Sequence, residues 1–251
     1  MTTLGQWAGV AEERLGVCPG CGSIELTGPT LIGGKFRRFG VPYSACASCG
    51  LLFQDPMPVP SKLSEWYAGS GYRTKIGSRL PSPIVIQRQA ERAVAAARFI
   101  LARKKTCLGM AELGGGLGAL CSALRAEYDC PTVNVEIDQT YASISRKAGS
   151  ETADEIPDGP FDLIATLHTV EHLPNPLEVL ERMYQVLAPG GHLYVEVPRD
   201  EPDVVHTLVF GLESVRKLIG HAGFRVLECL QAQPIADLGT VLICWATKEA
   251  T

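Results

Sequence analysis

Two histidines and a glutamate lie within five residues of one another, in the stretch His168-Thr169-Val170-Glu171-His172. Histidine titrates near neutral pH, and a carboxylate beside it can orient the ring or stabilise its charged form. An apolar run typical of a β-strand leads into this stretch, so the ionisable side chains are expected where that strand leaves its sheet. His168, Glu171 and His172 are therefore the candidate acid–base residues.

A glycine-rich turn marks a second candidate site. It contains Gly114, Gly116 and Gly118, and Glu112 stands two residues before the first glycine. Glycines let a ligand lie against backbone that carries no side chains. These glycines also fit the dinucleotide-binding fingerprint, but the acid ahead of them favours a cofactor that carries a cationic group over a pyrophosphate.

Two acids end the next predicted strand, over residues 133–138. Glu136 lies at the distance from the glycines at which an acid accepts hydrogen bonds from ribose hydroxyls. Either Glu136 or Asp138 could instead cap the helix predicted over 139–148. Ribose binding is the favoured role for Glu136, whereas both roles stay open for Asp138.

Four cysteines form two copies of a Cys-x-x-Cys-Gly pattern near the N-terminus. They are Cys18, Cys21, Cys46 and Cys49. Paired knuckles of this kind are typical of a tetrahedral zinc site, and four thiolate ligands leave no open position for catalysis. The sequence therefore predicts a structural zinc ion, held beside an extended hairpin that turns near residues 33–34.

Alternating strands and helices are predicted over the rest of the chain. Strands are expected over 106–113, 133–138, 151–156, from 161, 187–198, 223–226 and 241–247, and helices over 85–103, 120–128, 139–148, up to 186, and 212–222. Such alternation is typical of an open parallel sheet whose ligands bind at the carboxyl ends of its strands. Cys107, Cys229 and Cys244 lie in apolar strands and are predicted to be small core residues.

Composition narrows the class of protein. The chain has 251 residues, of which 46% are hydrophobic and 20% charged, with a net charge of −4. Residues 1–80 hold eight Lys/Arg against five Asp/Glu, an imbalance too mild for a nucleic-acid surface. The first 16 residues do not read as a signal peptide, and no stretch approaches a membrane span. Nine cysteines then indicate a reducing compartment, so a cytoplasmic location is expected.

Several motifs together resemble one enzyme family. The order Glu-x-Gly-x-Gly-x-Gly from Glu112 is similar to motif I of the class I S-adenosylmethionine-dependent methyltransferases. The stretches Phe-Asp-Leu-Ile…Glu-His-Leu-x-x-Pro (161–176) and Val-Leu-x-Pro-Gly-Gly-x-Leu (186–193) are similar to its later motifs. The cysteine module and the Trp66-Tyr67…Gly71-Tyr72 segment resemble the N-terminal region of members that act on small molecules and sugars. The resemblance covers roughly residues 18–245.

The resemblance implies an α/β fold: a Rossmann-like, seven-stranded methyltransferase sheet with a small N-terminal zinc-binding β module. Residues 1–60 would form that module, 61–104 a linker with an aromatic lid segment and a helix, and 105–251 the methyltransferase domain. Tyr67 and Tyr72 would cover the cofactor, or the aromatic residues would pack the module onto the domain. The predicted cofactor site consists of Glu112, Gly114, Gly116, Gly118, Glu136, Ile137, Asp154, Leu167, His168 and Tyr72.

The resemblance leaves three roles open for Glu171 and His172. In deoxysugar C-methyltransferases the comparable pair supplies the base, which makes His172 the predicted proton acceptor and Glu171 its assistant. In ubiquinone-type O-methyltransferases a comparable motif holds a divalent metal, with an acid where this chain has His168. The pair could also serve only to orient its loop. His206 is a second-rank candidate for contact with the substrate.

The predicted function is methyl transfer from S-adenosylmethionine to a small-molecule acceptor, such as a sugar nucleotide or a secondary metabolite. The alternatives are an RNA methyltransferase and a non-catalytic binding protein on the same fold. Nucleic-acid and membrane partners are not expected, while a homo-oligomer is compatible with the sequence.

Overall fold

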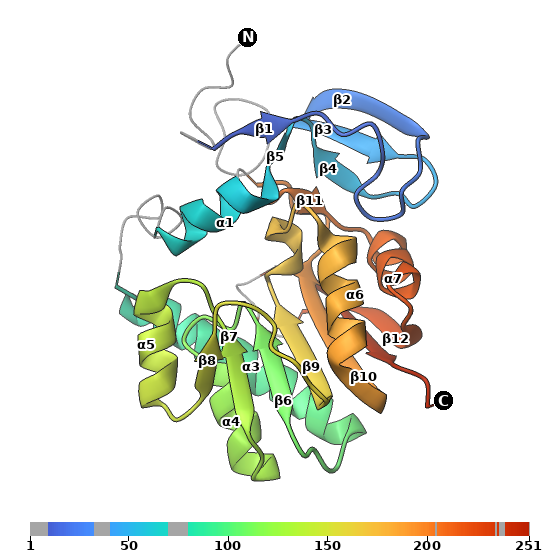
Figure 1. Ribbon diagram of the computed structural model, residues 1–251. Helices are drawn as coiled ribbons and strands as arrows, with labels where there is room; N and C mark the ends of the chain where they lie inside the picture. Colours follow the sequence, from blue (N-terminus) through green and yellow to red (C-terminus); the bar gives the residue numbers. More distant parts are fainter. Residues whose placement is uncertain are drawn as a thin grey trace.

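A central sheet of seven strands forms the body of the computed structural model, which describes residues 10–32, 41–69, 80–203, 205–233, 235 and 239–250 (Figure 1). The strand order is β12-β13-β10-β9-β6-β7-β8. The bounds are β6 Met110–Leu113, β7 Thr132–Val135, β8 Glu151–Ala153, β9 Phe161–Leu167, β10 Leu187–Pro198, β12 Arg225–Ala232 and β13 Val241–Thr247. This mixed α/β sheet confirms the predicted seven-stranded fold.

Parallel pairing brings the carboxyl ends of the central strands to one edge. The strands β6, β7, β8, β9 and β10 are parallel to their neighbours, whereas β13 runs antiparallel to β10 and β12. The glycine turn follows β6 and the His168–His172 stretch follows β9, which is the strand hydrogen-bonded to β6. The two candidate sites therefore leave the sheet side by side.

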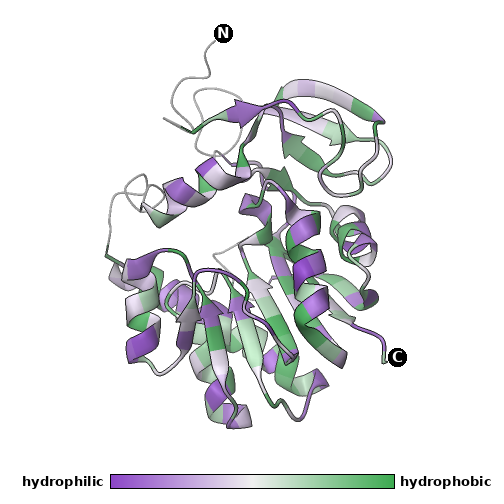
Figure 2. Ribbon diagram, viewed as in Figure 1, coloured by the Kyte–Doolittle hydropathy of each residue, from purple (hydrophilic) through white to green (hydrophobic). Residues whose placement is uncertain are grey.

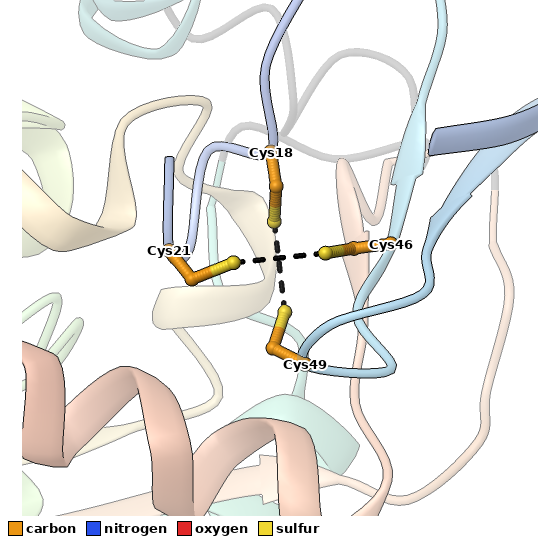
Figure 3. A group of neighbouring side chains, drawn as sticks. All are labelled: Cys18, Cys21, Cys46 and Cys49. Atoms are coloured by element: carbon orange, nitrogen blue, oxygen red, sulfur yellow. Dashed lines mark hydrogen bonds between the residues drawn. The ribbon is translucent and has the colours of Figure 1, made fainter. Parts of the chain in front are cut away.

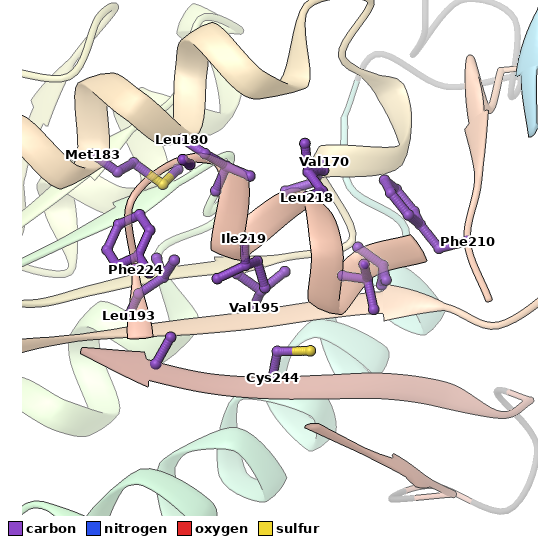
Figure 4. Packing of buried hydrophobic residues seen from close by; sticks show 14 of the residues in the cluster. Val170, Leu180, Met183, Leu193, Val195, Phe210, Leu218, Ile219, Phe224 and Cys244 are labelled. Carbon is purple, nitrogen blue, oxygen red and sulfur yellow. The ribbon is translucent and has the colours of Figure 1, made fainter. Parts of the chain in front are cut away.

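Helices cover both faces of the sheet. Their bounds are α3 Pro83–Arg103, α4 Ala119–Tyr128, α5 Gln139–Lys147, α6 Pro176–Val186 and α7 Leu212–His221, and a 3-10 turn, η1, spans Val170–His172. Side chains alternate between the faces because successive residues of a strand point in opposite directions. Tyr194 packs in the cluster beneath α3 and α4. Leu193 and Val195 pack beneath α6 and α7 (Figure 4). Figure 2 shows hydrophobic residues along the central strands and hydrophilic residues on the helices that cover them.

The N-terminal module has a sheet of its own. Its strands are β2 Leu26–Ile32, β3 Val41–Cys46 and β4 Leu52–Gln54, with β1 Glu12–Glu13 and β5 Met57–Pro58 forming a separate pair before helix α1 Pro60–Ala68. A fourth strand, β11 Leu208–Val209, joins this sheet at β4. Because β11 comes from the range predicted for the methyltransferase domain, the two parts are joined by backbone pairing as well as by the chain.

Module and main sheet also share one hydrophobic core. Leu51 and Phe53 of the module belong to the same buried cluster as Phe210 and Leu218, which lie on the α7 side of the main sheet (Figure 4). Gly20 also lies at this junction, since a Cβ there would be 2.8 Å from Leu51 of the module and 3.8 Å from Leu218 of α7. The module is therefore fixed on the main sheet.

Two differences from the sequence analysis concern cysteines and strand length. Cys229 and Cys244 were predicted to be separate core residues, but they face each other across β12 and β13 and are joined in a disulfide. The strand predicted over 106–113 begins only at Met110, because the preceding residues form the loop that follows α3. Among the described residues, no helix is long and apolar enough to cross a membrane.

Candidate active site

The glycine turn is a cradle that side chains would fill. Gly114, Gly116 and Gly118 all adopt positive φ angles, of 69°, 55° and 73°. A Cβ at Gly114 would collide with Thr169, and one at Gly116 would lie 2.8 Å from the Gln89 side chain. Both position and conformation therefore require glycine, and the backbone is left open to a ligand.

Glu136 spans the floor of this cradle. One carboxylate oxygen accepts a hydrogen bond from the Gly116 N–H at 3.0 Å and the other from the Asp138 N–H at 2.8 Å. Asp138 caps helix α5, because its Oδ1 accepts from the N–H groups of Thr140 and Tyr141. Asp138 therefore caps the helix, which is one of the two roles that the sequence left open for it. Glu136 lines the cavity beside Ile137.

Glu112 lies buried beneath the turn. Its carboxylate accepts a hydrogen bond from the Cys121 N–H at 3.3 Å, at the first turn of α4. Burial raises the pKa of Glu112 to about 7, against the effect of the Cys121 contacts, and the nearby Glu136 adds to the rise. A cationic group placed in the cavity would favour the ionised form of this carboxyl.

His168 lies between two buried carboxylates at the carboxyl end of β9. Its Nδ1 is 3.6 Å from Glu171 Oε1, and its Nε2 is 3.3 Å from Glu196 Oε1. Burial opposes the charged ring, but contacts with the two glutamates outweigh it and raise the pKa of His168. With a φ of 50°, its backbone is in the left-handed region that non-glycine residues seldom adopt, and such strain is concentrated at functional sites.

Glu171 is the buried charge at the centre of the site. Its side chain is 1% exposed, and neither carboxylate oxygen has a hydrogen-bond partner among the described residues. Burial by itself would raise the pKa of Glu171, but His168, His172 and His206 outweigh it and lower the pKa to about 2. The carboxylate is therefore charged, and it is placed to stabilise a positive charge on a neighbouring ring.

His172 presents a defined tautomer to the cavity. Its Nδ1 lies 2.9 Å from the carbonyl oxygen of Val205. A carbonyl only accepts hydrogen bonds, so Nδ1 carries a proton and the neutral ring has its lone pair on Nε2. Burial lowers the pKa of His172, although Glu171 opposes that shift. A neutral imidazole with Nε2 3.8 Å from a carboxylate suits proton abstraction, because Glu171 would stabilise the imidazolium that results.

His206 reaches the site from a distant part of the chain. Its ring centroid lies 5.0 Å from that of His172, and its Nδ1 contacts the carbonyl oxygen of Glu201 at 2.8 Å. One ligand atom each from Glu171, His172 and His206 lies within 4.8 Å of the others, so a divalent cation is a competing occupant of this position. The sequence analysis ranked His206 second, because nothing in its local pattern predicts this proximity.

Glu196 was missed by sequence analysis. It lies on β10, is 1% exposed, and accepts a hydrogen bond from the Tyr194 hydroxyl at 2.7 Å. The available signal was an acid inside an apolar strand, which is unusual unless the acid has a partner. Here the partners are Tyr194 and His168.

One cavity of about 1530 Å³ connects the glycine cradle with the histidines. Asp154 and Leu167, two candidate cofactor-site residues, line this cavity, and Asp154 also accepts a hydrogen bond from Gln139 at 2.7 Å. Tyr67 of α1 lines the cavity too, with its ring 6.2 Å from that of His172. Tyr72 lies outside the described residues. The volume exceeds that of typical single-ligand pockets and provides space for a nucleoside cofactor and a small acceptor.

The four N-terminal cysteines converge from two loops (Figure 3). The Cys18 and Cys49 sulfurs are 3.6 Å apart, and so are those of Cys21 and Cys46. Zinc–sulfur bonds of about 2.3 Å in a tetrahedron would separate the sulfurs by about 3.8 Å. The glycines that follow each knuckle, at positions 22 and 50, have positive φ angles of 72° and 75°. The donor set therefore fits a four-cysteine metal site.

Comparison with known proteins identifies the family of this fold. A methyltransferase domain family matches residues 86–229, more than half of the chain. Among curated relatives, ajmaline N-methyltransferase of Rauvolfia serpentina is 26% identical over 170 residues, which are 61% of this chain and 57% of that protein. A ubiquinone biosynthesis O-methyltransferase of Pseudomonas aeruginosa is 29% identical over 122 residues, 43% of this chain and 52% of the relative. The chain thus spans about half the length of these relatives.

A solved structure supports the same conclusion at the level of the fold. The Burkholderia thailandensis 1,6-didemethyltoxoflavin-N1-methyltransferase, with bound 1,6-didemethyltoxoflavin and S-adenosylhomocysteine, superposes with a TM-score of 0.62 at 13% identity. The match covers 89% of this chain and all of that one. With the sheet order, the glycine cradle and the family match in agreement, the chain belongs to the methyltransferase domain family.

Proposed function

We propose that the protein transfers a methyl group from S-adenosylmethionine to a small-molecule acceptor, with His172 as the general base. The observation that carries the proposal is the single cavity that joins the glycine cradle to the Glu171–His172 pair. S-Adenosylmethionine supplies a methyl group on a sulfonium, a leaving group that needs no protonation. The protein must therefore bind the cofactor, orient the acceptor and remove its proton.

Cofactor binding is supported by the shape and charge of the cradle. Gly114, Gly116 and Gly118 would bring backbone against the cofactor, Glu136 would accept hydrogen bonds from the ribose hydroxyls, and Glu112 would offset the cofactor's positive charge. The same cavity is lined by Asp154, Ile137, Leu167 and His168. The ajmaline N-methyltransferase and the ubiquinone biosynthesis O-methyltransferase among the relatives support a small-molecule acceptor. We propose a sugar nucleotide or a secondary metabolite as that acceptor.

Proton removal is assigned to His172 rather than His168. His168 is held between two carboxylates that favour its charged form, so it is a poor acceptor of protons. His172 is kept neutral by burial and has its lone pair on Nε2. In this proposal Glu171 stabilises the His172 imidazolium after transfer, and His168 holds Glu171 in place.

A bulky residue at Gly116 should abolish cofactor binding. In Gly116→Val the new side chain would meet Gln89 and adopt a positive φ, which β-branched residues disfavour. We expect S-adenosylhomocysteine affinity, measured by calorimetry, to fall by at least about 100-fold. Gly109→Val is the matched control, since a Cβ at Gly109 meets nothing within 4 Å. Normal affinity in Gly116→Val would contradict this placement of the cofactor.

Cofactor affinity should depend on pH through Glu112. Without ligand, its pKa of about 7 lies above the ordinary carboxyl value, so the group is largely protonated in mild acid. A cation favours the ionised form, so binding releases a proton below about pH 7, and affinity weakens up to about tenfold per pH unit as the pH falls. Calorimetry with S-adenosylmethionine in buffers of different ionisation enthalpy measures this release. Glu112→Gln should remove the pH dependence, and a flat wild-type profile would exclude the role.

Replacing His172 should separate transfer from binding. We expect His172→Gln to lower methyl transfer by about 10²- to 10⁴-fold while S-adenosylhomocysteine affinity changes little. Transfer is followed as S-adenosylhomocysteine formed from S-adenosylmethionine with a panel of small-molecule acceptors. His192→Gln is the control, because His192 stacks on Trp245 at 4.7 Å and does not line the cavity. Full transfer by His172→Gln would rule out His172 as the base.

A divalent cation held by Glu171, His172 and His206 is the alternative that the geometry also suits. The two mechanisms differ in their response to chelators. Proton removal by His172 alone predicts that a chelator, at a concentration that leaves zinc content unchanged, does not affect transfer. Loss of transfer that is restored by added Mg²⁺ or Mn²⁺ would favour the metal.

We further propose that Cys18, Cys21, Cys46 and Cys49 bind structural zinc. The purified protein should then contain about one zinc per chain by elemental analysis. Cys46→Ser should lose the metal and unfold at lower temperature, because the bonds between zinc and the four cysteines stabilise the folded module. Cys107→Ala is the control, since Cys107 lies outside the cluster and should leave zinc content unchanged. A zinc-free but fully stable protein would contradict the assignment.

A further inference from the structure

We propose that the N-terminal module positions the catalytic histidine through a segment that contains Asp203 and residues 205–207. Tyr43 and Gln54 of the module hold backbone carbonyls of this segment, and its Val205 carbonyl fixes the His172 ring. The inference rests on the proposed function, because it assigns the module a role in that same site. It makes Tyr43 and Gln54 positioning residues, although neither touches the reacting groups.

The module holds this segment through hydrogen bonds to its backbone carbonyls. The Tyr43 hydroxyl of β3 lies 2.8 Å from the carbonyl oxygen of His206 and 3.0 Å from that of Asp203. The Gln54 side-chain amide, at the end of β4, donates to the same His206 carbonyl at 2.8 Å. The Gln54 backbone N–H donates to the carbonyl of Thr207 at 2.8 Å, one residue before β11 pairs with β4. The hydrogen bonds act on backbone atoms, so they fix the path of the segment.

The segment in turn holds the site through hydrogen bonds to Glu171 and His172. The Val205 carbonyl accepts from His172 Nδ1, and the Thr207 hydroxyl donates to the carbonyl of Glu171 at 3.1 Å. The side chain of Val205 packs against Leu63, in a small cluster that also includes Tyr67. Glu171 is therefore held by Thr207, whose carbonyl the module holds, and His172 is held by Val205, which directly precedes His206 in the chain.

The module can act as a fixed support because it is anchored independently of this segment. Its buried residues share the core of the main sheet, and Lys217 of α7 donates to the carbonyl of Ser48 at 3.0 Å. Tyr43 and Gln54 are themselves 2% and 1% exposed. Burying a hydroxyl and an amide is costly unless they form hydrogen bonds, and here the partners are the carbonyls of the segment.

Fixing Val205 matters because it determines which ring nitrogen of His172 carries the proton. If the carbonyl moved away, the neutral ring could place its proton on Nε2 and hydrogen-bond towards Glu171 instead. A ring with that tautomer has no lone pair directed into the cavity and cannot accept the acceptor's proton there. The module would thus control the fraction of molecules that are competent for transfer.

The test removes one hydroxyl from the module. Tyr43→Phe should lower turnover about tenfold in the S-adenosylmethionine assay with the acceptor panel, while S-adenosylhomocysteine affinity stays within about twofold of wild type. Tyr128→Phe is the matched control, because the Tyr128 hydroxyl also donates to a backbone carbonyl, that of Lys104 at 2.7 Å, but does not line the cavity. Equal losses of turnover in the two variants would mean a general effect on stability and would overturn the inference.

A spectroscopic measurement tests the tautomer directly. The chain has five histidines, so the ring ¹⁵N signals of His172 can be assigned by comparison with His172→Gln. At mildly alkaline pH the wild type should show the Nδ1-protonated form. Tyr43→Phe combined with Gln54→Leu should shift the ring towards a mixture of tautomers, whereas Tyr128→Phe should not. An unchanged His172 signal in the double variant would overturn the inference.

The outcomes separate this inference from the proposed function. If His172→Gln abolishes transfer but the double variant keeps both its tautomer and its turnover, the module does not position the base, and the proposed function stands. If the double variant changes the tautomer while transfer survives both it and His172→Gln, the module holds the ring but His172 is not the base.

Discussion

The buried charge of Glu171 is the constraint on which the site depends. A carboxylate that is 1% exposed loses most of its hydration, and this loss is tolerated only when positive or polar groups compensate for it. The compensation comes from His168, His172 and His206, which lie on two separate segments of the chain. The segment around His206 must therefore dock correctly before the charge of Glu171 is balanced.

That requirement gives the N-terminal module a physical role beyond its own stability. The segment containing His206 leaves the main sheet after β10 and enters the module's sheet as β11. Its backbone carbonyls accept hydrogen bonds from Tyr43 and Gln54 of the module's sheet and from His172 of the η1 turn, which follows β9 of the main sheet. The proposed acceptor site thus lies at the junction of two sheets. A displacement of either sheet would move the same few backbone carbonyls.

Sequence patterns predicted the main sheet and the position of the glycine turn well, because those features are local. The strands and helices follow from an alternating apolar pattern along the chain, and the need for glycine at Gly114, Gly116 and Gly118 follows from a turn a few residues long. Glu196 and His206 could not be placed in the same way, since their partners are 28 and 34 residues away from them in sequence (His168 and His172). The pairing of Cys229 with Cys244 depended likewise on the register of β12 against β13, which a sequence pattern does not determine.

The cofactor half and the acceptor half of the cavity differ in how readily their residues can be substituted. The glycine cradle of the cofactor half is built from one strand, one turn and one helix terminus, so a substitution there strains the turn itself, as the close approach of Gln89 to Gly116 indicates. The acceptor half is assembled from α1, η1 and residues 198–203, 205 and 206, which contact one another through side chains and single carbonyls. Such contacts can be exchanged without breaking the main sheet. Differences in acceptor are therefore expected to arise from the module and its junction, while the glycine cradle stays the same.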